Sequence, residues 1–451
     1  MTIVVNSPTA VESHRLSCHF AMITEGLPGP GYHGGAVASW AVLEAMLDRG
    51  HTVTVIGLMD PGGPYAAHRD EQVAFLQEHG IEVRLVDFSA EKQRARNSTP
   101  RPGSIMGRML RLFDRRTYDL WSVYHGLLND SLQGLSLDGI FCYHFEPVSA
   151  LSGKDTEAPI TVCAVDLYHL PAFERWRERT ASFAKYTRDL FAHIAYSYAQ
   201  RRMMTDLFRR CQCRIEFAPH YAKWFRKRAG CEDTLYIPTP VHDPVGSEWR
   251  QQRSEPGLTG GKPRILMIGD LSGTATASGL RLCRDHVFPE LENQLGADGF
   301  EVRLVGGGQL TADLKVLESK PYIVRPGRVM PPDAEFLSAD VVLVPTPHTL
   351  GVRVRILNAF SYGCCVVSHT GNCAGIPEIV HGENALVAND GPGLAQEVLR
   401  ATRDPHLARG IGEKGRAIYE KHFAASVAGT RVVVEMERLA TGAHDIAQDT
   451  V

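Results

Sequence analysis

The chain has 451 residues, of which 44% are hydrophobic and 22% are charged, and its formal net charge is −3. This balance excludes the basic excess of a nucleic-acid binder, and the hydrophobic content excludes a disordered chain. The length exceeds what one ordinary core holds, so it predicts two domains of roughly 200 residues each.

Short apolar runs alternate with helix-length amphipathic segments twice along the chain, which predicts an α/β fold of two doubly wound, Rossmann-like sheets. In the first half, strands are expected at 19–24, 51–58, 81–88, 138–145 and 158–166. In the second half, they are expected at 264–270, 301–307, 322–329, 340–346, 364–370 and 385–390. We expect an N-terminal domain over 1–240, a linker over 241–262, a second domain over 263–420, and a C-terminal helix and tail over 421–451.

A glycine-rich loop follows the first predicted strand and leads into a predicted helix. Gly34 and Gly35 lie where that helix begins, and backbone amides at a helix N-terminus bind phosphate. Gly29, Gly31 and Gly34 also satisfy the pattern G-x-G-x-x-G, and Asp60 stands where a dinucleotide fold has its ribose-binding acid. The loop is longer than the tight turn of that fingerprint, so a nucleotide-dependent oxidoreductase is kept as an alternative.

Two later strands of the first half end in residues that could carry chemistry. His144 and Glu146 lie at the end of one strand, and Asp166 and His169 lie at the end of the next. Doubly wound sheets bind ligands at the carboxyl ends of their strands, so this edge is expected to be a working cleft. An ordinary hydrogen-bonded loop histidine is the other interpretation of His144.

The stretch GVRVRILNAFSYG, residues 351–363, places two arginines at the start of a predicted helix. The i, i+4, i+7, i+8 spacing of a buried helix face is met by Val352, Ile356, Ala359 and Phe360. Arg353 and Arg355 then fall in the first turn, where cations oppose the helix dipole. An anion between these side chains and the free amides would reverse the sign of the interaction, so we expect a phosphate there. Two arginines that simply reach solvent are the alternative.

Two segments of the first half are basic although the whole chain is not. Residues 91–116 hold eight Lys or Arg against two acids, and residues 175–228 hold fourteen against four. They predict either solvated helix faces or a surface for an anionic acceptor or a membrane. No apolar run reaches the roughly 18 residues of a membrane span, and the N-terminus lacks the order of a secretory signal. We therefore expect a cytoplasmic protein whose membrane contact, if any, is peripheral.

The second half resembles a known family in the order and spacing of three segments. These are ILMIGDLSGTATASGLRLCRDHVFPEL, VRPGRV and ADVVLVPTPHTLGVRVRILNAFSYGCCVVSHTGNCAGIPEIVHGENALVAND. Over residues 262–425 they resemble the donor domain of the retaining glycosyltransferases of family 4, which have the GT-B fold. The resemblance implies two Rossmann-like domains facing across a cleft, with a UDP-, GDP- or dTDP-sugar as co-substrate and no other cofactor or metal. It also implies a hydroxyl acceptor, lipid-linked, saccharide or secondary metabolite, on the N-terminal domain.

The resemblance also implies roles for single residues. The donor diphosphate falls on Arg353, Arg355 and the helix start at Gly34 and Gly35, and the sugar faces His144; we take His144 and the two arginines as the catalytic candidates. The further donor contacts are expected at Gly269, Thr276, Gly327, Arg328, Val329, Gly351 and Asn358, with residues 327–329 near the base. Acceptor contacts are expected at Asp166 and His169.

The chain departs from the family at two positions where many members carry glutamates. These positions hold Leu350 and Asn358, and the second glutamate of the family binds the ribose hydroxyls. Asn358 still donates and accepts hydrogen bonds but brings no charge. Thr276 also stands where a related subgroup often has asparagine. A catalytically inactive relative that binds sugar nucleotides is therefore a second alternative.

Overall fold

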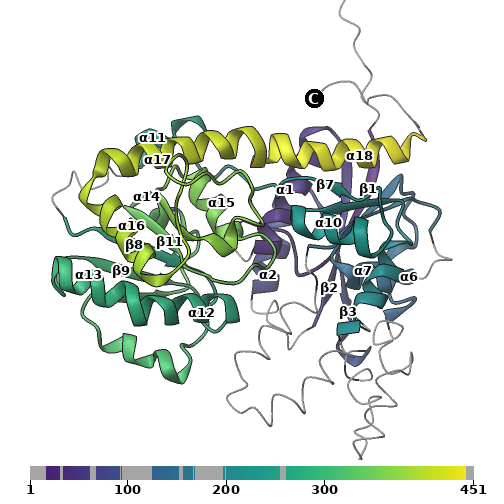
Figure 1. Cartoon of the computed structure of the whole chain (residues 1–451). Coiled ribbons are helices and arrows are strands. Elements are labelled where there is room, and N and C mark those ends of the chain that lie inside the picture. The colour runs from purple at the N-terminus through teal and green to yellow at the C-terminus, as the bar shows by residue number, and fades with distance from the viewer. Residues whose placement is uncertain are drawn as a thin grey trace, which may run out of the picture.

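The computed structural model describes residues 17–30, 34–60, 68–91, 93, 124–151, 156–165, 167, 197–198, 200–253 and 261–442. Its helices and strands form two α/β domains that lie side by side, each built around one parallel sheet (Figure 1). The predicted fold class is confirmed, and the expected domain limits at 240 and 263 fall between the last strand of the first sheet and the first strand of the second.

The N-terminal sheet has seven strands in the order β3-β2-β1-β4-β5-β6-β7. The strands are β1 His19–Glu25, β2 Thr52–Met59, β3 Glu82–Asp87, β4 Gly139–Tyr143, β5 Ile160–Cys163, β6 Cys213–Glu216 and β7 Leu235–Tyr236. The helices are α1 Gly34–Asp48, α2 Arg69–Glu78, α6 Asn129–Leu132, α7 Phe145–Ala150 and α10 Pro219–Arg228. All five expected strands are present. The sequence missed β6 and β7, which are only four and two residues long and therefore too short to produce a recognisable apolar run.

The C-terminal sheet repeats this order with six strands, β10-β9-β8-β11-β12-β13. The strands are β8 Arg264–Ile268, β9 Glu301–Val305, β10 Ile323–Gly327, β11 Val341–Val344, β12 Val366–His369 and β13 Leu386–Ala388, all of which were expected. The helices from the linker onward are α11 Trp249–Gln252, α12 Thr274–Leu282, α13 Phe288–Leu295, α14 Asp333–Leu337, α15 Val354–Ser361, α16 Gly391–Arg403, α17 Pro405–Ile418 and α18 Thr430–Ala440, with further segments of 3₁₀ and π helix. In each sheet the strand order reverses at the first strand, and ligands bind outside such a reversal.

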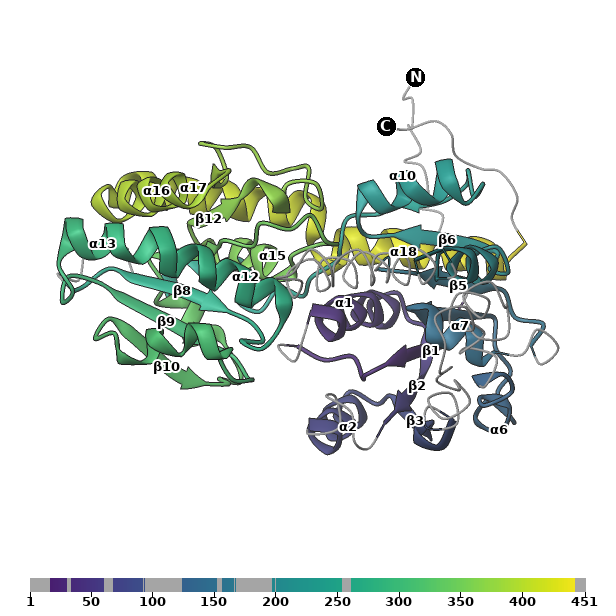
Figure 2. The same ribbon diagram turned by 60° about the horizontal axis from the view of Figure 1, so that its bottom comes forward.

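The chain crosses between the domains at two points that lie side by side. The amide of Val241 donates to the carbonyl of Phe423 at 2.8 Å, and the amide of Ala425 donates to the carbonyl of Val241 at 3.1 Å. After the second crossing, α18 runs across the N-terminal domain beside α1 (Figures 1 and 2). Glu437 on α18 is paired with Arg49 at 2.6 Å. The C-terminal helix is therefore packed on the opposite domain from the one that precedes it in sequence.

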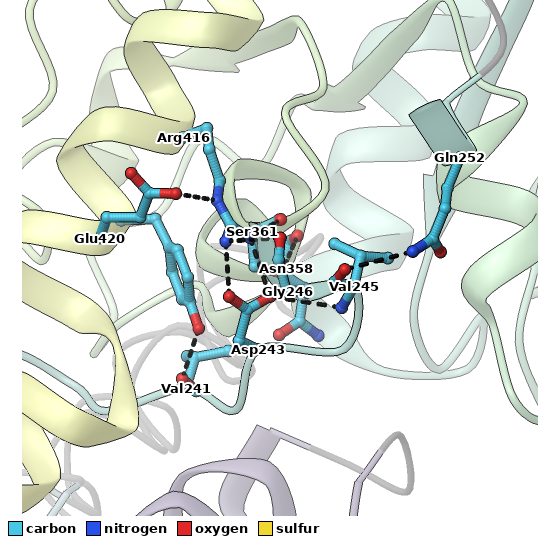
Figure 3. Close-up of polar contacts among 10 residues, drawn as sticks. Val241, Asp243, Val245, Gly246, Gln252, Asn358, Ser361, Arg416 and Glu420 are labelled. Atoms are coloured by element: carbon cyan, nitrogen blue, oxygen red, sulfur yellow. Dashed lines mark hydrogen bonds and ion pairs between the residues drawn. The ribbon is translucent and has the colours of Figure 1, made fainter. Parts of the chain in front are cut away.

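Residues 241–253 of the expected linker pack against the C-terminal domain. Arg416 reaches from α17 into this segment (Figure 3), where its side chain is 3% exposed. Its guanidinium donates to both carboxylate oxygens of Asp243, at 2.9 and 2.5 Å, to the carbonyl of Ser361 and to Glu420 at 2.7 Å. Ser361 is the last residue of α15. One buried cation therefore joins the linker, α17 and the carboxyl end of α15.

Arg416→Met should destabilise the fold, because it removes the cation paired with Asp243 and the donor to the carbonyl of Ser361. The amides of Val245 and Gly246 still donate to Oδ1 of Asp243 in the variant. Because the side chain of Asp243 is 33% exposed and water screens it, we expect a loss of about 2 kcal/mol, below the roughly 3–5 of a fully buried pair. Urea unfolding measures the loss. Lys414→Met, an exposed position on the same helix, is the matched control, and equal stability of the two variants would contradict the assignment.

Candidate functional site

A cavity of about 630 Å³ lies between the two domains. Its N-terminal wall is made by the start of α1 and by His68 and Gln72 at α2. Its C-terminal wall comes from the ends of β8, β9 and β10 and from the first two turns of α15. The cavity thus faces the carboxyl edge of the second sheet, where parallel sheets bind their ligands.

The starts of two helices from different domains meet in this cavity. A Cβ atom placed on Gly34, the first residue of α1, would lie 3.2 Å from Cγ2 of Val354, the first residue of α15. Both helices therefore direct their N-termini, and with them the positive ends of their dipoles, toward the same space. The predicted helix start at Gly34 is present, whereas Gly35 follows it in α1 and does not line the cavity.

Arg355 lies at the centre of this positive region. Its guanidinium donates to the carbonyl of Ile268 at 2.9 Å and to the hydroxyl of Thr276 at 3.3 Å. It lies so close to Gly269 that a Cβ atom there would be 2.9 Å from Nη1. Gly269 lines the cavity, as expected. Thr276 does not line it and instead accepts a hydrogen bond from Arg355.

The charge of Arg355 is only partly compensated. The pKa of Arg355 is lowered to about 10, mainly by burial and in part by the cation of Arg353, whereas the carboxylate of Asp270 acts against both. Both hydrogen-bond acceptors of the guanidinium are neutral. An anion in the cavity would relieve this unfavourable charge, as the position of the two arginines in the sequence predicts.

Three of the four residues expected on the buried face of α15 are buried in it, whereas Val352 precedes the helix and is half-buried. Ile356, Ala359 and Phe360 are fully buried in the core of the C-terminal domain. Arg353 is the N-cap of α15, with φ −87° and ψ 84°, and lines the cavity together with Arg355 and Asn358. The placement of these residues agrees with the interpretation as an anion site, and their contact with a ligand stays a prediction.

The segment expected near the base lines the cavity in part. Arg328 and Val329 line it directly. Gly327 has φ +81° and its carbonyl accepts from the amide of Gly306 at 2.8 Å, which ties the end of β10 to that of β9. The glycines at 306–308 also line this wall and were not predicted, although a glycine run directly after a strand could have indicated them.

His144 does not line this cavity. It follows β4 with φ +76°, and its amide donates to the carbonyl of Cys163 at 2.8 Å. Burial lowers the pKa of His144 to about 4, although a hydrogen bond with the backbone of Ala164 acts in the opposite direction. The imidazole is therefore neutral near pH 7, when it can donate one hydrogen bond and accept another.

Several expected features lie outside the described residues or the cavity. Gly31 of the dinucleotide pattern and the acceptor candidates Asp166 and His169 lie outside the described residues. Gly351 precedes the cavity wall, and its amide donates to the hydroxyl of Tyr221 in the N-terminal domain at 2.8 Å. Within the described ranges, no three His, Cys, Asp or Glu side chains are grouped as metal ligands. None of the helices described here has both the length and the apolar character needed to cross a bilayer.

Comparisons with known proteins agree with this architecture. Residues 262–404 match the family described as glycosyl transferases group 1, and a search of curated proteins finds no match. The sucrose-phosphate synthase from Thermosynechococcus elongatus aligns with TM-score 0.64 at 14% identity, over 94% of this chain and 100% of its own. TarM of S. aureus, in a complex with UDP, fondaparinux and alpha-GlcNAc-glycerol, aligns with TM-score 0.64 at 10% identity over 94% and 99%. HepE of Anabaena, with UDP and glucose, aligns with TM-score 0.58 at 14% identity over 92% and 98%.

At these identities the solved structures show the fold alone. Two Rossmann-like domains of the GT-B type are confirmed. The family match to the C-terminal domain, together with this fold, supports a glycosyltransferase of group 1 and does not favour the oxidoreductase suggested by Gly29, Gly31 and Gly34.

His144→Asn should change how stability depends on pH. The pKa of His144 is about 4 in the fold, below its ordinary 6.5, so the unfolded chain takes up the proton first and stability falls as the pH drops from 6.5 toward 4. Asparagine tolerates the positive φ but does not titrate. Urea unfolding at pH 7 and pH 5 should show a smaller loss in the variant than in the wild type. His406→Asn, at an exposed position, is the control and should lose as much unfolding free energy between pH 7 and pH 5 as the wild type. Equal losses in all three proteins would refute the assignment.

Proposed function

We propose that the protein is a retaining glycosyltransferase of family 4 that transfers a sugar, of hexosyl type, from a nucleotide-diphosphate donor to a hydroxyl acceptor. The observation that carries the proposal is the partly compensated Arg355, placed with Arg353 where the starts of α1 and α15 meet. Such a site suits a diphosphate, because it offers two guanidinium groups and the starts of two helices together. The family match of residues 262–404 supports the same function.

The chemistry follows from what the site can stabilise. In the transfer, the bond between the sugar's anomeric carbon and the donor phosphate oxygen breaks, and the acceptor hydroxyl forms a new bond on the same face. The departing phosphate takes the acceptor's proton. Negative charge builds on the leaving diphosphate, where Arg353, Arg355 and the amides near Gly34 would stabilise it. A neutral His144 would hydrogen-bond a sugar hydroxyl rather than supply charge.

The donor would lie along the C-terminal wall. We assign the base to the segment at Arg328 and Val329, the ribose to the neighbourhood of Asn358, and the diphosphate to the arginines, because all line one cavity. The complexes of HepE and TarM that contain UDP make UDP-sugars the first donors to test, ahead of GDP- and dTDP-sugars. Metal independence stays a prediction, supported by the sufficiency of two arginines for the diphosphate charge.

The acceptor would bind on the N-terminal side of the cleft. Asp166 and His169 remain the proposed contacts. A lipid-linked, saccharide or secondary-metabolite acceptor and a peripheral membrane contact stay predictions, supported by the exposed Lys223, Lys227 and Arg228 of α10. Most of the other basic segment, 91–116, lies outside the described residues. A cytoplasmic location likewise stays a prediction.

Arg353→Ala and Arg355→Ala should each weaken diphosphate binding by about 1–3 kcal/mol, roughly 5- to 150-fold. Isothermal titration with UDP, GDP, dTDP and inorganic pyrophosphate measures this for each base and for the phosphates alone. The melting temperature should change little for Arg355→Ala, because loss of the bond to Ile268 is offset by removal of an unfavourable cation. Arg400→Ala, at a half-exposed side chain on α16, is the control.

The same titration decides between the alternatives. Normal binding in both arginine variants would overturn the diphosphate assignment, and absence of any nucleotide binding by the wild type would overturn the function. Binding without turnover of any donor, in a panel of UDP-, GDP- and dTDP-sugars, would identify the catalytically inactive relative instead. Binding of a nicotinamide or flavin cofactor that depends on Gly34 would support the oxidoreductase hypothesis instead.

Asp270→Asn should have the opposite effect from the arginine variants. Asp270 lines the cavity, and its carboxylate raises the pKa of Arg355. Asparagine keeps an oxygen for the bonds from Ser272 at 2.9 and 2.7 Å but removes a negative charge next to the diphosphate. Pyrophosphate should therefore bind more tightly, and weaker binding in this variant would show that Asp270 contacts the ligand favourably.

A further inference from the structure

Two consecutive residues of the N-terminal domain reach across to the C-terminal domain. His220 and Tyr221 lie in the first turn of α10. Nδ1 of His220 donates to the carbonyl of Ala374 at 2.9 Å, since a carbonyl only accepts. The hydroxyl of Tyr221 accepts from the amide of Gly351 at 2.8 Å. Tyr221 is 1% exposed, so its bond is protected from water.

The two loops that receive these bonds are packed backbone to backbone. A Cβ atom on Gly375 would collide with the carbonyl oxygen of Gly351. A Cβ atom on Gly371 would lie 2.7 Å from the carbonyl oxygen of Pro347. No side chain fits between the loops at either point, so residues 347–351 and 371–375 form one unit. The first turn of α10 therefore forms hydrogen bonds with this unit through two adjacent residues, His220 and Tyr221.

One residue, Val352, separates the loop at 347–351 from Arg353 of the anion site. Gly351 has φ +53°, which turns the chain toward α15. Val352 packs against apolar clusters of both domains. Arg353, the N-cap of α15, follows directly. The N-terminal domain thus holds the two residues before Arg353, through the hydrogen bond to Gly351 and the apolar packing of Val352, although Arg353 belongs to the C-terminal domain.

We propose that Tyr221 is a positioning residue for the diphosphate site. Through the amide of Gly351 it holds the loop that places Arg353 in the cavity, so the donor site is complete only when the start of α10 is docked. This inference rests on the proposed function, since it deepens the role of Arg353. It ties donor binding to the approach of the domain that would carry the acceptor.

The chain offers a matched control for this proposal. Tyr236 makes another hydrogen bond between the domains, from its hydroxyl to Oε1 of Glu378 at 3.2 Å. This bond does not touch the loop at 347–351. Tyr236→Phe and Tyr221→Phe each remove one hydroxyl at the domain interface, and only the second should change the anion site.

The test is a double-mutant cycle on ligand binding. UDP, GDP, dTDP and pyrophosphate are titrated calorimetrically into the full-length wild type, Tyr221→Phe, Tyr236→Phe, Arg353→Ala and the Tyr221→Phe/Arg353→Ala double variant. We expect Tyr221→Phe to weaken binding about five- to tenfold, as loss of one buried hydrogen bond would. Tyr236→Phe should bind like the wild type. In the Arg353→Ala background, Tyr221→Phe should have no further effect, because residues that act through one another are not additive.

Three outcomes would overturn the proposal. Tyr221→Phe could bind as tightly as the wild type, it could weaken binding equally with and without Arg353, or Tyr236→Phe could weaken binding as much. The second outcome would reveal a general structural role, which melting temperatures of all variants would also report. If the wild type binds none of the four probes, the proposed function fails and this inference falls with it. If wild-type binding depends on Arg353 but not on Tyr221, the role of Tyr221 is overturned and the proposed function stands.

Discussion

The burial of Arg355 among neutral acceptors is the interaction on which the rest of the site depends. The guanidinium joins the end of β8, through Ile268, to the start of α12, through Thr276, and it leaves no room for a side chain at Gly269. Burying a charge costs free energy unless a counter-charge is supplied. The positive ends of α1 and α15 point toward the same cavity. An anion bound there would offset the cost of burying the guanidinium.

The second constraint is the double crossing of the chain between the domains. Val241 pairs with the backbone at 423–425, and α18 then packs on the N-terminal domain. Arg416 fixes the segment after the first crossing to α17 and to the end of α15. Rotation of one domain against the other therefore has to bend both crossings at the same place.

Local pattern was enough to predict most of the fold. The strands with continuous apolar runs were found, and so was the buried face of α15 at Ile356, Ala359 and Phe360, because burial repeats with the period of the element itself. β6 and β7 were missed because pairing in the sheet, rather than their own composition, makes them strands. The site was predicted in part: Arg353 and Arg355 were recognised by their place at a helix start, whereas His68, Gln72 and Asp270 were not.

The sequence by itself determined two parallel α/β sheets, the helix start that carries two arginines, and the resemblance of residues 262–425 to a donor domain. Only the tertiary structure decided that Gly34 of one domain lies next to Val354 of the other with no room for a larger side chain, that His144 does not line the cavity, and that Tyr221 accepts a hydrogen bond from Gly351. The reason is physical. Periodicity and capping act within a few residues of chain. The contact of Arg355 with Ile268 joins residues 87 positions apart, and that of Gly351 with Tyr221 joins residues 130 positions apart, where no local preference specifies a partner.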